Sequence, residues 1–433
     1  MRRQRLSDPL RRPLFRRLAS TYAVNELGDW MGIVALSILV FDRTGSALAT
    51  AGLFLGTRFL PALLAPILVA RAEQPPPRIA LPLIYCGETA AFGGLALLAT
   101  HFSVAGVIAL ATIDGTLALA GRSLTRAVVG TLLESADELR AGNAILNVAF
   151  TGGAAIGPAL AGLVVAGLGV QSALLLDASS FYLVAWILLT AGPLPQVEPE
   201  PGVLRERVGA GLAYIRERTK LRRLLIAQGA AFVFFAAVIP IEVIYAKQTL
   251  GVGDSGYGLL LASWGVGMVV GSVVFAAVRR APLPLLLLLS TTAVGAGYLG
   301  LAVAPTLTLA CAASVVGGAG NGVQWVAVIS AVQELTVQGM RARVISVLES
   351  IGAAMPGIGF VVGGLVATAG QPRTTFLLAG IGILAIVAVA TPVLGGQWSE
   401  RLYRANRDDL DESDEIVVEL IAGRAPTQFD PEV

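Results

Sequence analysis

Two carboxylates interrupt a long apolar run near the N-terminus, where the sequence reads NELGDWMG. Glu26 and Asp29 lie in a stretch, residues 18–41, in which most other side chains are apolar. A carboxylate in apolar surroundings is costly to keep charged, so it pairs with a cation or cycles between its protonated and ionised forms. Arg58 and Asp114 stand in two further apolar runs. The four residues are therefore candidates for one charged site, which the surrounding elements must assemble.

The composition identifies those elements as membrane-spanning helices. Hydrophobic residues make up 55% of the 433 residues and charged residues only 14%, which lies outside the range of soluble domains. A window of about 19 residues finds twelve apolar segments, and none shows the period-two alternation of a membrane barrel. We predict an all-helical integral membrane protein with spans at residues 18–41, 46–70, 79–100, 104–124, 143–167, 171–192, 222–245, 256–278, 283–304, 307–329, 344–369 and 374–394.

Lysine and arginine are distributed unevenly between the two sets of loops. If the N-terminus is cytoplasmic, 27 of the 31 basic residues fall in cytoplasmic segments, and these include Arg122 and Arg126 near the end of the fourth span. The opposite loops hold only Arg43, Lys247 and Arg373. Cytoplasmic loops of membrane proteins carry an excess of Lys and Arg. The sequence therefore predicts a multi-pass protein of the cell inner membrane with both termini in the cytoplasm.

The spans fall into two similar groups of six. The stretch ELRAGNAILNVAFTGGAAIGPALAGLVVAG leads into the fifth span, and VQGMRARVISVLESIGAAMPGIGFVVGGLVA leads into the eleventh. Between the groups, a Pro-rich linker precedes a basic amphipathic helix expected at the membrane surface. Two six-helix halves are typical of secondary transporters. We predict a basic cytoplasmic N-terminus (1–17), an N-terminal half (18–192), a cytoplasmic central loop (193–221), a C-terminal half (222–394) and a cytoplasmic tail (395–433).

These stretches, together with NELGDWMGIVAL in the first span, YGLLLASWGVGMVVGS in the eighth and QELTVQGMRARVISV before the eleventh, resemble a known family. The family is the major facilitator superfamily (MFS) of transporters, in the drug and siderophore efflux branch that includes macrolide and enterobactin exporters. The resemblance covers nearly the whole chain. It implies the MFS fold, with twelve transmembrane helices in two pseudo-symmetric halves, and a cavity lined by helices one, four, seven and ten.

Two motifs of that superfamily can be compared with this chain. The antiporter motif of the fifth helix is matched by Gly153, Gly157, Pro158 and Gly162. The glycines favour close helix packing and the proline permits a kink. The alternative, which is about equally favoured, is ordinary packing of small residues with no role in the direction of transport. The gating loop after the second span departs from the family pattern, because its glycine and aspartate are missing. Only Arg71, Glu73 and Arg78 remain of that loop.

The charged residues in the spans are the candidates for proton coupling. With a rise of about 1.5 Å per residue, Asp29 lies roughly 16 Å into its span and Asp114 lies roughly 15 Å in from the other face. We predict that Asp29 is the leading coupling acid, with Arg58 or Asp114 adjusting its proton affinity, and that Glu26 and Asp114 are the next candidates for that role. Two alternatives are that Arg58 forms a structural ion pair with Asp29 or Asp114, and that Glu26 reaches interfacial water. Glu88 is set aside because the resemblance makes the third helix peripheral.

Aromatic and amide side chains are the candidates for the wall of a substrate cavity. Aromatic rings offer a large contact area to lipophilic or cationic ligands, although such a helix face is also common in simple packing. The predicted cavity residues are Asn25, Trp30, Phe232, Phe235, Asn321, Gln324 and Trp325.

These observations favour a secondary active transporter. We expect proton-coupled efflux of a lipophilic or amphipathic small molecule, such as a drug, natural product or siderophore, by alternating access. The chain has no G-x-x-x-x-G-K-[ST] motif for ATP, no G-x-S-x-G element and a single histidine, His101. We therefore predict no enzyme activity, no cofactor, no metal site and no nucleic-acid partner, and we expect the partners to be a small-molecule substrate, protons and membrane lipid.

Two other functions remain open for the same fold. A lysophospholipid transporter would have a cavity that opens sideways to the bilayer. A membrane sensor or scaffold would have lost transport, and the degenerate loop after the second span is the feature that favours it.

Overall fold

The computed structural model describes residues 8–72, 75–133, 135–196, 204–278, 281–337 and 340–390. Regular structure in this part of the chain is helical, and twelve helices are long and apolar enough to cross a membrane. Each of them overlaps one predicted span, so the all-helical prediction with twelve spans is confirmed. The twelve run over Pro13–Thr44, Ala47–Ala65, Pro77–Thr100, Val104–Leu132, Ala141–Leu168, Val170–Leu189, Thr219–Thr249, Asp254–Ala277, Leu283–Val303, Leu307–Glu334, Arg343–Ala369 and Pro372–Ala390.

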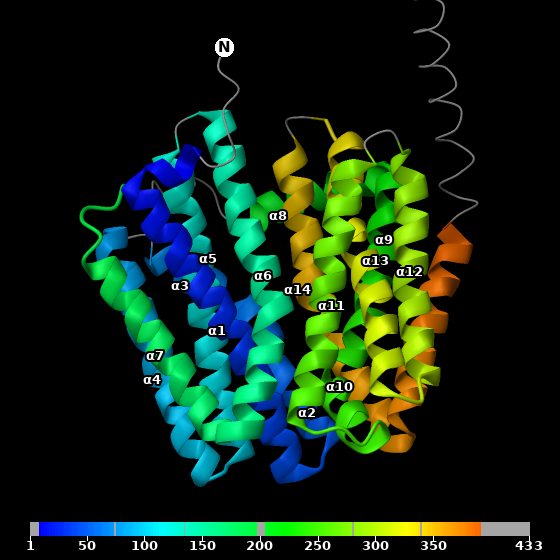
Figure 1. Ribbon diagram of the computed structural model, residues 1–433. Helices are drawn as coiled ribbons and strands as arrows, with labels where there is room; N and C mark the ends of the chain where they lie inside the picture. Colours follow the sequence, from blue (N-terminus) through cyan, green and yellow to red (C-terminus); the bar gives the residue numbers. More distant parts are fainter. Residues whose placement is uncertain are drawn as a thin grey trace, which may run out of the picture.

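Figure 1 shows two groups of helices side by side, which we call the first and the second half. The first half contains η1 (Asp8–Arg11), α1 (Pro13–Thr44), α2 (Ala47–Phe54), η2 (Leu55–Phe59), α3 (Leu60–Ala72), α4 (Pro77–Thr100), α5 (Val104–Leu132), α6 (Ala136–Leu168) and α7 (Val170–Leu189). The second half contains α9 (Thr219–Val238), η3 (Ile239–Ile241), α10 (Glu242–Ile244), η4 (Tyr245–Thr249), α11 (Asp254–Ala277), α12 (Leu283–Val303), α13 (Leu307–Glu334), α14 (Arg341–Ala369) and the last helix, Pro372–Ala390.

The helix predicted in the central loop is present as α8 (Leu204–Glu217), which packs against α9 and α14. The α1 helix begins at the top of Figure 1, and α8 lies near the same end of the molecule. We call this end the terminal side, because the described chain also ends there after twelve spans, and we call the other end the opposite side.

The two halves meet along two pairs of spans, α6 with α11 and the second span with α14. Glycines allow close approach in both pairs. A Cβ atom built on Gly364 of α14 would lie 3.0 Å from the Cβ of Ala51 in α2, and one built on Gly357 would lie 2.6 Å from the ring of Phe59 in η2. Small residues at such crossings let helix backbones come together without a side chain between them.

Among the described residues, the hydrophobic core is continuous between the halves only on the opposite side. There the later turns of α1, including Leu36 and Val40, belong to the same buried cluster as Ile241, Tyr245 and Tyr257 of the second half. On the terminal side the second half has its own cluster, which includes Leu224 of α9 and Val328 of α13. The packing therefore joins the halves on the opposite side and leaves them separate on the terminal side.

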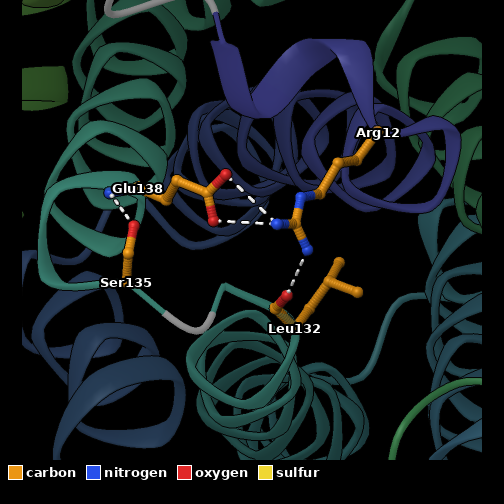
Figure 2. A network of polar contacts seen from close by, with 4 residues as sticks. All are labelled: Arg12, Leu132, Ser135 and Glu138. Atoms are coloured by element: carbon orange, nitrogen blue, oxygen red, sulfur yellow. Dashed lines mark hydrogen bonds and ion pairs between the residues drawn. The ribbon is translucent and has the colours of Figure 1, made fainter. Parts of the chain in front are cut away.

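A polar network ties the start of α1 to the rest of the first half on the terminal side (Figure 2). Arg12 donates hydrogen bonds to both carboxylate oxygens of Glu138 in α6, at 3.1 and 2.9 Å, and to the carbonyl of Leu132 at 3.0 Å. The hydroxyl of Ser135 caps α6 by accepting a bond from the Glu138 amide. The Nη2 atom of Arg12 makes both bonds to Glu138 and Nη1 makes the bond to Leu132, so this network holds α1, α5 and α6 together at one end.

Candidate functional site

Asp29 of α1 forms an ion pair with Arg122 of α5 inside the first half. The Nη1 atom of Arg122 donates a hydrogen bond to Oδ2 of Asp29 at 2.8 Å, and it lies 3.8 Å from Oε2 of Glu26. Asn25 donates a second hydrogen bond to Asp29, at 3.3 Å. The side chain of Glu26 is fully buried, whereas those of Asp29 and Arg122 are 13% and 20% exposed. The alternative that Glu26 reaches interfacial water is therefore not supported, because its side chain is fully buried. Glu26 lies behind the partly exposed ion pair of Asp29 and Arg122.

Arg122 and Arg126, which the sequence analysis counted in a cytoplasmic segment, lie on the same helix as the fourth span. The α5 helix continues to Leu132, so both arginines lie within the fourth span. Arg126 donates a hydrogen bond to the Tyr22 hydroxyl of α1 at 3.0 Å. Each arginine is thus satisfied by α1, which is why the helix can continue past two charges. The two apolar residues that follow them, Val128 and Val129, are buried, and their apolar character was the sequence signal that the helix continues.

Arg58 lies within η2, a π-helical turn in the second span. Such turns interrupt α-helices rarely and often occur at functional sites. Its guanidinium lies 5.7 Å from the centre of the Trp30 ring, and none of the described carboxylates forms an ion pair with it. Asp29 and Asp114 are nevertheless among its electrostatic neighbours. Arg58 is exposed at this depth, so it borders open space inside the bundle, and Arg122 is the ion-pair partner of Asp29 instead.

Three further carboxylates are buried in the first half around Asp29. Asp114 of α5 is 8% exposed, Asp177 of α7 is 2% exposed and Glu88 of α4 is fully buried. All three interact electrostatically with Asp29. Both oxygens of Glu88, and one each of Asp114 and Asp177, have no hydrogen-bond partner among the described residues. The predicted Glu26, Asp29, Arg58 and Asp114 therefore lie in one charged cluster.

The sequence analysis missed Arg122, Glu88 and Asp177 as members of this cluster. Glu88 was set aside because of the helix that carries it, yet its side chain points into the bundle and is fully buried. Asp177 is a single carboxylate in the apolar run LLLDASSF, which is the same signal that drew attention to Asp29. Its oxygens pack against α1, where Cβ atoms built on Gly28 and Gly32 would collide with them.

The glycines of the antiporter motif lie on two faces of α6. Gly153 and Gly157 face α1: a Cβ built on Gly153 would lie 3.0 Å from the Glu26 carbonyl, and one built on Gly157 would lie 2.7 Å from the Cβ of Trp30. Gly162 faces α11 of the second half. The Pro158 carbonyl also meets α11, where it would collide with a Cβ on Gly258. We call this strip of α6 the glycine seam, and it connects the helix of Asp29 to the other half.

The predicted cavity residues on α9 and α13 separate into two groups. Phe232 packs against Trp325, with ring centres 6.2 Å apart, and Trp325 is 43% exposed. Phe235 instead packs inside the second half, 5.9 Å from Trp264 and 6.3 Å from Tyr298. Phe232 and Trp325 are therefore placed to meet a ligand, whereas Phe235 takes part in internal packing.

The remaining predicted residues have different surroundings. Trp30 packs edge-on against Phe150 of α6, with ring centres 6.3 Å apart. Asn321 is half-buried, and Gln324 donates a hydrogen bond to Thr291 of α12 at 3.1 Å. In the gating loop, Arg78 is exposed. Arg71 is described only as part of α3, and Glu73 lies outside the described residues.

Lys247 joins the two halves on the opposite side. Its Nζ lies 2.5 Å from Oδ1 of Asp42 at the end of α1 and 2.6 Å from Oδ1 of Asp254 at the start of α11. The lysine is part of η4, the second π-helical turn of the described chain. This three-residue bridge, Asp42–Lys247–Asp254, reinforces the side where the hydrophobic core already joins the halves.

Comparisons with known proteins agree with this geometry. A family model described as a transmembrane secretion effector of the MFS matches residues 6–416. No curated protein matches the chain. Among solved structures, a mutant of the nucleoside transporter NupG is 13% identical with a TM-score of 0.69, and the match covers 88% of this chain and 99% of that one.

Two other solved structures share the fold. A POT family transporter in complex with a thioalcohol-conjugated peptide is 14% identical with a TM-score of 0.71, covering 88% of this chain and 96% of that one. A bacterial homologue of the human lysosomal transporter Spinster, in an inward-facing and unoccupied conformation, is 15% identical with a TM-score of 0.63, covering 88% and 95%. With the family model spanning nearly the whole chain, the protein belongs to the transmembrane secretion effector family of the MFS and is a membrane transporter, not an enzyme.

Proposed function

We propose that this transporter exports a lipophilic or amphipathic small molecule in exchange for protons, with its terminal side in the cytoplasm. The observation that carries the proposal is the ion pair between Asp29 and Arg122, which lies deep in a span and borders open space. The excess of Lys and Arg in the predicted cytoplasmic segments supports this orientation in the inner membrane. The predicted cytoplasmic segments still hold more Lys and Arg than the opposite loops when Arg122 and Arg126 are removed from the count.

Proton binding to Asp29 is the proposed switch. A neutral carboxylic acid has lost its charge attraction to a guanidinium, so protonation weakens the bond between Asp29 and Arg122. Glu26 lies 3.8 Å from the same nitrogen of Arg122 and can take the guanidinium over. Because Glu26 is fully buried, this exchange would draw the positive charge away from the open space. Substrate and proton would then compete through Arg122.

The carboxylates around Asp29 support a role in proton handling. Asp114, Glu88 and Asp177 are buried and interact electrostatically with Asp29. The spans of the first half thus hold more buried carboxylates than guanidiniums. Charges in a membrane interior are costly unless they are paired. The unpaired carboxylates can bind protons that enter or leave through Asp29.

Alternating access would proceed from the arrangement described above. The shared core and the Asp42–Lys247–Asp254 bridge close the opposite side, whereas the halves have separate cores on the terminal side. Such a state would receive substrate from the cytoplasm. Aromatic faces are offered to the substrate by Trp30, whose ring lies next to the guanidinium of Arg58 in the first half, and by the pair Phe232–Trp325 in the second half.

The test is transport by purified protein in proteoliposomes with an imposed pH gradient. The panel contains a macrolide, a catecholate siderophore and a lipophilic cationic dye, each with and without an uncoupler. We expect Asp29→Asn to bind the transported compound and to support exchange, but not to move it uphill. Glu334→Gln, the same kind of change at an exposed carboxylate of α13, is the matched control and should pump normally.

Three outcomes would change the proposal. If Asp29→Asn pumps as the parent does, the coupling acid lies elsewhere, and Glu26 and Asp114 become the next candidates. Movement of lysophosphatidylcholine in place of these compounds would assign the lipid-transporting alternative. Binding without any transport by the parent protein would favour a sensor or scaffold.

A further inference from the structure

The second half has a partly open cavity of about 270 Å³ that is separate from the charged cluster of the first half. Four helices surround it: α9, α12, α13 and the last helix. Lining residues lie at positions 224–231 of α9, 284–291 of α12 and 386–390 of the last helix, which places the cavity toward the terminal side. Its apolar wall includes Leu224, Ala227, Leu287, Leu288, Val328 and Ile386.

Polar groups in this wall are few and are amides or a hydroxyl. Gln228 of α9 lines the cavity, is only 6% exposed, and has no hydrogen bond to any of the described residues. Gln324 of α13 donates one hydrogen bond to Thr291 of α12, and its carbonyl oxygen makes none within the described chain. Gln228 therefore presents an amide donor and acceptor to the cavity from an otherwise apolar wall.

The ligand that suits this wall is uncharged. None of the described residues that line the cavity carries a charge. An ionised ligand would lose its hydration there without gaining an opposite charge, which is strongly unfavourable. A pure hydrocarbon would fill the space but would leave the Gln228 amide unpaired. A neutral lipophile with an ester, amide or hydroxyl group satisfies both the apolar wall and the amides.

We propose that this cavity is a second binding site, which takes an uncharged lipophilic ligand through hydrogen bonds to Gln228 and Gln324. The site goes beyond the proposed proton exchange and does not depend on it, because no acid of the first half contributes to its wall. A ligand held there would contact both α9 and α13.

The test is equilibrium binding to the full chain in phosphatidylcholine nanodiscs. The probes are radiolabelled 1-monolauroylglycerol and lauramide, which are neutral and carry hydrogen-bonding heads; unlabelled lauric acid at pH 9 and dodecane are the competitors. We expect saturable binding of at least one neutral probe, with no effective competition by laurate anion or dodecane.

Variants locate the binding. Gln228→Met keeps the size of the side chain and removes its amide, so we expect about a ten-fold loss of affinity, as for one or two lost hydrogen bonds. Ala227→Leu narrows the cavity and should abolish binding. Gln333→Met makes the same exchange at an exposed position of α13 and serves as the control.

Three results would overturn the proposal. The first is absence of saturable binding by both neutral probes, which would mean a cavity holding only water. The second is equal competition by laurate or dodecane, which would contradict recognition of a neutral polar head. The third is unchanged affinity in Ala227→Leu or in folded Gln228→Met. If Gln228→Met does not fold, Ala227→Leu alone decides where the probe binds.

Discussion

Replacing Gly157 by Leu should separate α1 from α6 and disturb the ion pair of Asp29. A Cβ atom at position 157 would lie 2.7 Å from the Cβ of Trp30 and 3.1 Å from the carbonyl oxygen of Leu27. Carbon atoms pack at about 3.5–4.0 Å, so the two helices must move apart by about 1 Å even for alanine. Such a shift exceeds the tolerance of the 2.8 Å hydrogen bond between Asp29 and Arg122.

The energetic effect follows from overpacking. Inserting carbon atoms into a well-packed interface costs about 1–3 kcal/mol. Replacing a helical glycine also stabilises the helix by up to about 1 kcal/mol, and a control must remove this contribution. Gly152 is that control: it lies on the same helix, and a Cβ atom there would meet nothing within 4 Å. The difference between Gly157→Leu and Gly152→Leu therefore isolates the collision with α1.

The assays are the apparent Tm of the purified protein and uphill transport in proteoliposomes. We expect Gly157→Leu to enter the membrane, to unfold a few degrees below Gly152→Leu and to lose most uphill transport, with Gly157→Ala between them. Equal Tm values and equal transport in the two leucine variants would refute the close packing of the glycine seam.

Three further predictions follow from other contacts. Lys247→Met removes the ion pair to Asp42 that crosses between the halves, so spin labels placed on the two halves at the opposite side should show a larger population of long distances; an unchanged distribution would mean that the apolar core alone closes that side. Arg12→Ala removes the charge-assisted hydrogen bonds to Glu138, so the apparent Tm should fall by an amount that Arg11→Ala, at an exposed neighbour, does not reproduce. Reporter fusions after Val433 should be active only with a cytoplasmic reporter; an external signal would contradict the proposed orientation.

Hydropathy alone was enough to predict the twelve spans, because a helix that crosses a membrane must keep about twenty apolar residues together whatever its neighbours are. Asp29 was recognisable for the same reason, since a single carboxylate stands out in such a run. Its partner was not. Arg122 lies near the end of an apolar run, where a charge looks like the start of a loop, and only the approach of α1 shows that it is paired within the span.

The direction in which side chains point was also beyond the sequence. Phe235 and Phe232 lie three positions apart on α9, so a helical period assigns both to one side of the helix. The structure gives them different neighbours, because α12 approaches one and α13 the other. Gln324 was expected in the substrate cavity, yet its hydrogen bond to Thr291 turns it toward the interior of the second half. Such differences depend on tertiary packing, which a single chain's periodicity does not contain.

The glycine seam has a consequence for how fast the transporter can change state. Where α6 meets α11 of the second half, backbone faces backbone at Gly162, Gly258 and Gly265, and few rotatable side chains interlock at these points. Interlocked side chains resist sliding, because each must leave its rotamer before the helices can move. At the seam this source of friction is reduced, so the two halves can rock against each other with little repacking. The slow step of the cycle is then expected at the opposite side, where Lys247 must leave Asp42 of the first half and a shared apolar core must open to water.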